Sequence, residues 1–195
     1  MYEVKATSNL LILGGQARPV PAPPMSEKTS DISLVEAVRR GDREAFGRLY
    51  KLYAPMVHGI LLARVPHGEV QDLMQDVFLI ALKRLGTLRE AGAFGGWLAM
   101  ITRNHAVNFH RRPQAGDEEL TEDMAQTSPL EARAHEILTV IRSLPEAYRE
   151  TLILRLVEGM SGAEIAQRTG LTSDSVRVNL QRGMKLLREL YKGEH

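Results

Sequence analysis

The chain has 195 residues, a formal net charge of +1 and no cysteine. That length suffices for one large or two small domains, and the lack of cysteine excludes disulfides and thiolate metal sites. No apolar run approaches the roughly 20 residues that a membrane span needs. A cysteine-free chain fits a reducing compartment, so we expect a cytoplasmic protein.

The small net charge conceals an uneven distribution. Residues 31–112 hold twelve Lys and Arg against eight Asp and Glu. Residues 113–130 hold five acidic side chains and no basic ones, and residues 131–195 hold ten basic and nine acidic ones. Mildly basic blocks that flank an acidic segment point weakly towards nucleic acid as a partner.

The first thirty residues are predicted to be a disordered extension. The segment RPVPAPP (18–24) cannot hold a helix, because each proline lacks an N–H and restricts the residue before it. Met25 follows these prolines directly. Two alternatives stay open, a genuine N-terminal tail and a true start at Met25.

Residues 31–112 show helical periodicity throughout. Asp31 or Ser33 is expected to cap the first helix, and Gly41-Asp42 interrupts it before a second helix begins. A third helix is predicted over about 69–85. A glycine-rich loop then precedes a fourth helix, over about 97–110.

The third predicted helix has two contrasting faces. One is an apolar stripe expected to be buried: Val70, Leu73, Val77, Ala81 and Leu85. The other carries Asp72, Gln75, Asp76 and Leu79. On physical grounds alone a solvated helix face explains the second set better. A docking surface for a basic partner is the alternative, which Leu79 among polar residues favours slightly.

The fourth predicted helix mixes apolar residues with donors and cations. Its polar members are Arg103, Asn104, His105, Asn108, Arg111 and Arg112. Such a helix could lie along a nucleic-acid backbone. Trp97 could stack on an unpaired base, although a single Trp is more often a core residue.

The acidic segment 113–130 lacks apolar periodicity and is predicted to be a flexible linker. A second helical block, 131–193, follows it. The predicted fold is therefore all-α, with two small helical domains joined by the acidic linker.

The segment SGAEIAQRTGLTSDSVRVNLQRGMKLL (161–187) predicts a helix-turn-helix. Ser161 and Glu164 have the spacing of a capping box, which starts a short helix over about 162–169. Gly170 stands where the turn needs a positive φ, which glycine adopts at little cost.

The second helix of this unit is expected to begin after the N-cap Thr172. Its apolar stripe is Val176, Leu180, Met184 and Leu187. The remaining faces include Arg177, Val178, Gln181, Arg182, Lys185 and Arg188. The spacing is typical of units whose second helix enters the DNA major groove. A solvated basic face on a core helix is the alternative.

Taken in order, these motifs resemble a known family. DLMQDVF (72–78), WLAMITRNHAVNFHRR (97–112) and the segment 144–189 with its helix-turn-helix are similar to a bacterial RNA polymerase sigma factor. The class is the extracytoplasmic-function (ECF) one of the sigma-70 family. Residues 31–112 resemble its region two, and residues 131–193 its region four.

The resemblance implies roles that the bare pattern could not assign. Asp72, Gln75, Asp76 and Leu79 would bind the polymerase core. The minus-ten promoter element would be recognised and opened by Trp97, Arg103, Asn104, Asn108, Arg111 and Arg112. The minus-thirty-five element would be read by Thr172, Ser173, Arg177, Val178, Asn179, Gln181, Arg182 and Lys185. Asn108, Val178, Asn179 and Gln181 depart from common family residues, which affects the promoter sequence expected.

The same resemblance implies partners but no cofactor and no enzymatic activity. The expected partners are the clamp helices and flap of the bacterial RNA polymerase core, promoter DNA and an anti-sigma factor. The main alternative is a free-standing helix-turn-helix regulator, for which Leu144–Leu190 alone would suffice. An enzyme is a weaker alternative, because the six histidines are scattered and no phosphate loop is present.

Overall fold

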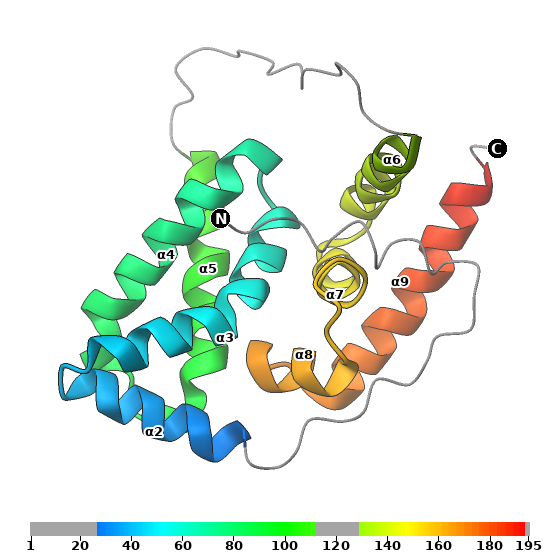
Figure 1. Ribbon diagram of the computed structural model, residues 1–195. Coiled ribbons are helices and arrows are strands. Elements are labelled where there is room, and N and C mark those ends of the chain that lie inside the picture. The colour runs from blue at the N-terminus through cyan, green and yellow to red at the C-terminus, as the bar shows by residue number, and fades with distance from the viewer. Residues whose placement is uncertain (1–26, 112–128, 194–195) are drawn as a thin grey trace.

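The computed structural model describes residues 27–111 and 129–193. Within these ranges the chain forms α-helices, 3₁₀ helices, turns and irregular segments, and no β-strand. This confirms the all-α prediction (Figure 1). The predicted extension 1–30 and linker 113–130 lie outside the described residues, except for residues 27–30 and 129–130. These residues begin the helices α2 and α6.

The first block contains four α-helices: α2 (Glu27–Arg39), α3 (Arg43–Leu62), α4 (Val70–Arg84) and α5 (Phe94–Arg111). Short 3₁₀ helices lie at His67–Glu69, Leu85–Thr87 and Ala91–Ala93. The four helices match those predicted, although α5 begins three residues before Trp97. The Asp42 side chain caps α3 by accepting a hydrogen bond of 3.0 Å from the Ala45 N–H.

The expected cap of the first helix was wrong. Helix α2 begins at Glu27, so Asp31 and Ser33 both lie inside it. The Asp31 side chain points inward, where its Oδ2 accepts a hydrogen bond of 2.8 Å from the Tyr53 hydroxyl on α3. A tertiary partner therefore uses the carboxylate that the sequence pattern assigned to a local cap.

The second block contains α6 (Pro129–Ser143), α7 (Glu146–Leu156), α8 (Gly162–Thr169) and α9 (Ser173–Gly193). The predicted capping box is present, with the Glu164 N–H donating to Ser161 Oγ and the Ser161 N–H donating to Glu164 Oε2. Gly170 has a φ of +75°. The helix-turn-helix predicted from local chemistry is thus formed by α8 and α9.

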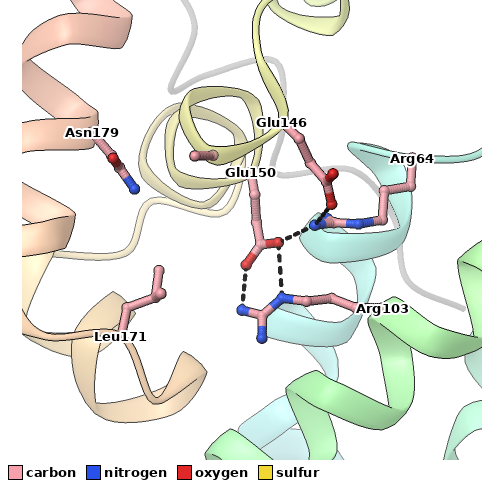
Figure 2. Close-up of a pocket in the computed structure, with 7 residues that line it drawn as sticks. Arg64, Arg103, Glu146, Glu150, Leu171 and Asn179 are labelled. Atoms are coloured by element: carbon pink, nitrogen blue, oxygen red, sulfur yellow. Dashed lines mark hydrogen bonds and ion pairs between the residues drawn. The ribbon is translucent and has the colours of Figure 1, made fainter.

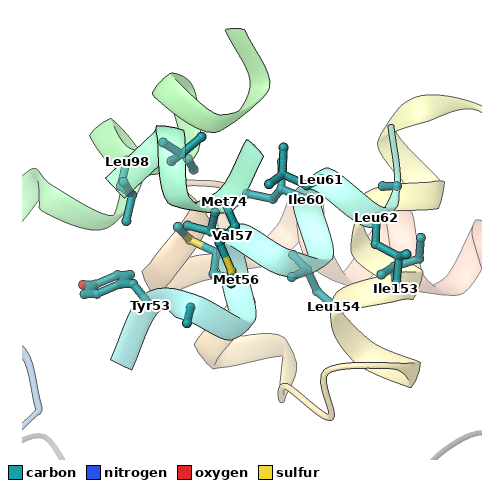
Figure 3. Close-up of a cluster of buried hydrophobic side chains, with 14 of the residues drawn as sticks. Tyr53, Met56, Val57, Ile60, Leu61, Leu62, Met74, Leu98, Ile153 and Leu154 are labelled. Carbon is teal, nitrogen blue, oxygen red and sulfur yellow. The ribbon is translucent and has the colours of Figure 1, made fainter. Parts of the chain in front are cut away.

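Helix α3 lies at the centre of the packing. It contacts α2, α4 and α5 on its own side, and α7 and α8 of the second block. Figure 3 shows the result, in which Met56, Ile60 and Leu61 of α3 share one buried cluster with Ile153 and Leu154 of α7. One apolar core therefore runs through both blocks of the described chain.

Polar contacts reinforce this junction at the C-terminal end of α3. Arg142 donates to the carbonyls of Leu62 and Val65 at 3.1 and 3.3 Å, and Arg149 donates to that of Ala63 at 3.2 Å. The last carbonyls of a helix have no partner within it and carry its negative dipole end. Two arginines of the second block therefore satisfy carbonyl groups at the C-terminal end of a helix in the first block.

Close backbone approach is built into the same junction. A Cβ on Gly95 of α5 would lie 2.6 Å from the carbonyl oxygen of Arg168 on α8. The two side chains nearest to a Cβ on Gly59 of α3 would belong to the second block, with Leu154 Cδ2 at 2.7 Å and Glu158 Cγ at 3.0 Å. Both glycines allow the two blocks to touch.

Within the two described ranges, we find no helix with the length and apolar character that crossing a membrane requires.

We expect Leu98→Ala to lower the free energy of unfolding by about 2–5 kcal/mol, because Leu98 is fully buried on α5 and its removal leaves a cavity. Urea unfolding followed by far-UV circular dichroism measures the change. Met100→Ala, on the same helix but half exposed, is the control and should stay within about 0.5 kcal/mol of the parent. Equal effects of the two substitutions would contradict the assigned core.

Candidate nucleic-acid interface

The outward face of α4 consists of the four residues predicted for it. Asp72, Gln75, Asp76 and Leu79 are all exposed, and Leu79 is 54% exposed beside Leu82 at 43%. The opposite stripe, from Val70 to Leu85, is buried as predicted. Helix α4 therefore presents two carboxylates next to two uncovered leucines, a combination that suits contact with another macromolecule.

Neighbouring side chains hold this face in position. Phe78 of α4 packs against Tyr50 of α3, with ring centroids 4.5 Å apart. Asp76 Oδ2 lies 3.4 Å from His105 Nε2 on α5. The two predicted surfaces, on α4 and α5, are thus adjacent and share one contact.

Three of the residues predicted to contact the minus-ten element form an exposed row on α5. Asn104, Asn108 and Arg111 are exposed, and Met100 and Val107 are uncovered beside them. These positions recur every three or four residues, so they lie on one side of the helix. Arg112 lies outside the described residues.

Trp97 has features of both roles considered for it, a core residue and a stacking surface for an unpaired base. The side chain is half-buried, and its ring centroid is 5.9 Å from that of Phe94. Part of the indole therefore packs in the protein, and part stays accessible at the start of α5.

Arg103 is the exception on α5, because it points towards α7 rather than outward. Its Nε and Nη2 donate to the two carboxylate oxygens of Glu150 at 3.1 and 2.7 Å (Figure 2). Arg64, in the turn that follows α3, reaches the same carboxylate at 2.6 Å and that of Glu146 at 2.6 Å. Two cations of the first block thus meet at one acid of the second.

Sequence reasoning missed Arg64 and Glu150. The partners Arg103 and Glu150 are 47 residues apart, and no local pattern joins them. The available signal was Glu150 itself, a charge next to the apolar run Leu152–Leu154 on a short helix. A carboxylate in that position requires a cation if it is buried.

Glu150 is buried, with its side chain 5% exposed. Burial alone would raise its pKa, but the hydrogen bond from Arg103 and the positive charges of Arg64 and Arg103 outweigh burial. The pKa of Glu150 therefore lies below its usual value of 4.5, and the carboxylate is ionised at neutral pH.

A cavity of about 380 Å³ opens beside this cluster. Its lining residues come from both blocks: Arg64, Arg103, Glu146, Ala147, Glu150, Leu171 and Asn179. Leu171 and Asn179 belong to the helix-turn-helix, so the junction reaches the edge of the predicted DNA-reading unit (Figure 2).

Helix α9 displays most of its predicted reading residues. Thr172, Ser173, Arg177, Gln181, Arg182 and Lys185 are exposed, whereas Val178 and Asn179 are half-buried. The apolar stripe lies inward, with Val176 and Leu187 buried. Thr172 Oγ1 accepts a hydrogen bond of 3.1 Å from the Ser175 N–H, which places it at the N-cap as predicted.

Within residues 27–111 and 129–193, His, Asp and Glu side chains do not gather in threes as a metal ion would require. The exposed faces of α4, α5 and α9 instead carry hydrogen-bond donors, cations and carboxylates.

Comparison with known proteins shows the family of the chain. Residues 49–127 match the model of sigma-70 region 2, and residues 134–187 match that of sigma-70 region 4. The chain is 33% identical over 160 residues to the ECF RNA polymerase sigma-E factor of Escherichia coli, spanning 73% of this chain and 84% of that one. The chain belongs to the ECF sigma factors of the sigma-70 family.

A second relative agrees with this membership, and a solved structure shows the same fold. The ECF RNA polymerase sigma factor BldN of Streptomyces coelicolor is 29% identical over 177 residues, which cover 85% of this chain and 67% of that one. The solved structure of CnrH in complex with the cytosolic domain of CnrY has a similar fold. It superposes with a TM-score of 0.62 at 22% identity, covering 85% of this chain and 99% of CnrH.

Membership defines the protein's general role. As an ECF sigma factor, the protein binds RNA polymerase core and promoter DNA and directs promoter-specific initiation of transcription. The free-standing regulator is therefore not favoured, since region 2 accompanies the helix-turn-helix.

We expect Glu150→Gln to lower the free energy of unfolding by about 3 kcal/mol at neutral pH, because it leaves two cations without their buried acid. The lowered pKa of Glu150 means that its stabilisation is complete above 4.5 and is lost as pH falls through the native value. The gap between parent and variant should therefore shrink in acid.

Chemical unfolding across a pH series measures this gap. Glu146→Gln is the control, since Glu146 is 67% exposed and its removal should change stability little at any pH. A gap that stayed constant into acid would show that the charge of Glu150 is not the source of the stabilisation.

Proposed function

We propose that this ECF sigma factor divides its task among three exposed helix faces. The outward face of α4 would bind the polymerase core, α5 would recognise and open the minus-ten element, and α9 would read the minus-thirty-five element. The observation that carries this proposal is the pattern of exposure, since each helix has exposed polar side chains on one face and buried apolar side chains on the opposite one.

The first turns of α9 suit direct reading of base edges. In a helix-turn-helix, the N-terminal residues of the second helix face the bases of the major groove. Arg177 and Gln181 can each form bidentate hydrogen bonds to a purine, and Val178 can contact a thymine methyl group. Lys185 lies further along the helix and suits a phosphate, which fixes position but carries no sequence information.

The exposed row on α5 suits a single strand better than a closed duplex. Extruding a base from the stack costs a few kcal/mol, which a pocket and a favourable backbone path must offset. The amides of Asn104 and Asn108 can hydrogen-bond a base edge, Arg111 and Arg112 can hold phosphates, and the accessible part of Trp97 can stack.

Helix α4 suits docking on the polymerase core. Asp72 and Asp76 provide charge complementarity to a basic surface, and Leu79 provides apolar area at the centre of the contact. The chemistry of RNA synthesis would then reside in the polymerase, while this chain supplies promoter recognition and strand opening.

Regulation by an anti-sigma factor and a cytoplasmic location are part of the same proposal. Both rest on membership of the ECF class. The complex of CnrH with the cytosolic domain of CnrY is consistent with a protein partner that binds a chain of this fold.

Run-off transcription with purified bacterial polymerase core and a genomic-fragment library tests the function. Start sites that need this protein are expected. Asp72→Arg should abolish most of this initiation and weaken co-purification with the core, because it reverses one of the two acidic charges on α4. Glu44→Arg makes the same charge change on the exposed first turn of α3 and should leave initiation intact. Initiation without the protein, or equal loss in both variants, would contradict the proposal.

The two kinds of contact on α9 predict different defects at a promoter found in this way. Arg177→Ala should lose about 1–3 kcal/mol of discrimination at one base pair. Lys185→Ala should weaken binding to all sequences alike and reduce the salt slope by about one. Holoenzyme binding to single-base promoter variants, at several salt concentrations, separates the two. A uniform loss for Arg177→Ala would remove it from the reading set.

A further inference from the structure

Arg64 and Arg103 form a cluster whose partner is an acid of the other block. Arg103 arrives from α5 and Arg64 from the turn that follows α3, and both meet Glu150 of α7 (Figure 2). The side chains of Glu150 and Arg64 are 5% and 9% exposed, whereas that of Arg103 is 29% exposed. The first block alone would therefore carry two adjacent guanidinium groups with no acid between them.

This pair of guanidinium groups has the chemistry of a phosphate site. A planar guanidinium binds a carboxylate or a phosphate through the same bidentate geometry. Glu150 engages Arg103 in this way, through two nearly parallel hydrogen bonds. Arg64 Nε is buried and has no hydrogen-bond partner. With Glu150 as its partner, Arg64 thus keeps its Nε–H unsatisfied. A phosphate has more acceptor oxygens and could accept a hydrogen bond from it.

The location supports a nucleic-acid ligand. Arg103 precedes Asn104 on α5, the helix whose exposed row is assigned to promoter DNA under the proposed function. The cavity beside the cluster is bordered on the opposite side by Asn179 of α9. A strand that follows α5 would bring its phosphates to this edge of the first block.

We propose that Arg64 and Arg103 together bind a backbone phosphate of promoter DNA, and that Glu150 occupies this site in the closed chain. Helix α7 then competes with DNA for these two guanidinium groups. This inference rests on the proposed function, because it takes α5 as the helix that follows DNA.

Other contacts keep the competitor in place. His58 Nδ1 lies 2.6 Å from Glu158 Oε1, and Arg168 donates to the Leu52 carbonyl at 2.7 Å. Because α7 belongs to the same chain, its effective concentration at the site is high. Free DNA at ordinary concentration competes poorly, whereas a polymerase that holds the two blocks apart would expose both guanidinium groups.

The test compares DNA binding by the free, full-length protein and its variants. The probe is a fluorescently labelled duplex of mixed sequence with a single-stranded overhang, since phosphate contacts do not depend on sequence. Glu150→Gln removes the competing charge and should raise affinity roughly ten-fold, within the usual range for coupling between two sites. Glu146→Gln, on the same helix, removes an exposed carboxylate that contacts Arg64 but not Arg103, so it should raise affinity less than Glu150→Gln does, by under about two-fold.

A second substitution tests the role of Arg64 itself. In the Glu150→Gln background, Arg64→Gln should lower affinity and reduce the slope of log affinity against log salt by about one. Arg64→Lys keeps the charge and should retain the slope. An unchanged slope for Arg64→Gln would overturn the phosphate site and leave Arg64 as a contact of the closed chain only.

Gly95→Ala provides an opening variant without any change of charge. Its Cβ would lie 2.6 Å from the backbone carbonyl oxygen of Arg168 on α8, which must shift, so this variant should also raise affinity. If Glu150→Gln does not fold by circular dichroism, Gly95→Ala decides the question. Failure of a folded Glu150→Gln or, in its place, of Gly95→Ala to bind DNA more tightly than the parent would overturn the competition.

Run-off transcription by the parent protein separates the two proposals. Initiation by the parent together with unchanged binding by the opening variants defeats only this inference. No initiation under conditions where another sigma factor works on the same core defeats the proposed function.

Discussion

One buried carboxylate constrains how the two blocks pack against each other. Glu150 is buried on α7, which packs against α3, and it faces Arg103 of α5; an unpaired charge there would be costly. Arg103 and Arg64 offset that cost. The ionised carboxylate is therefore stabilised only while the two blocks keep their present arrangement. A buried ion pair is weak evidence for net stability, but it specifies geometry strictly, since losing either partner leaves a buried charge.

This constraint separates two groups of surfaces in the sigma factor. The outward face of α4 lies away from the junction and keeps its polar side chains exposed, as does most of the outward face of α9, where Asn179 alone among the predicted reading residues lines the cavity at the junction. On α5, by contrast, Asn104 and Asn108 are exposed while Arg103 is held by α7. The closed chain therefore leaves exposed the faces proposed to bind the polymerase and to read duplex DNA, and it covers part of the face proposed to follow the opened strand.

Local chemistry explains why much of the fold could be predicted. The capping box of Ser161 and Glu164, the positive φ of Gly170 and the buried stripe of α4 each depend on residues within one or two turns. The start of α2 could not be predicted in the same way. Asp31 has the chemistry of an N-cap, yet it lies inside the helix, where the hydroxyl of Tyr53, on another helix, donates a hydrogen bond to it.

The sequence by itself determined the all-α class, the helix-turn-helix and the family, because periodicity, caps and motif order are written in neighbouring residues. Only the tertiary structure decided which polar side chains are available and which are occupied. Arg103 and Asn104 are adjacent in sequence and were assigned to one surface, but a turn of 100° per residue directs one towards Glu150 and the other outward. Partners 47 residues apart meet through packing alone, and no local pattern encodes that meeting.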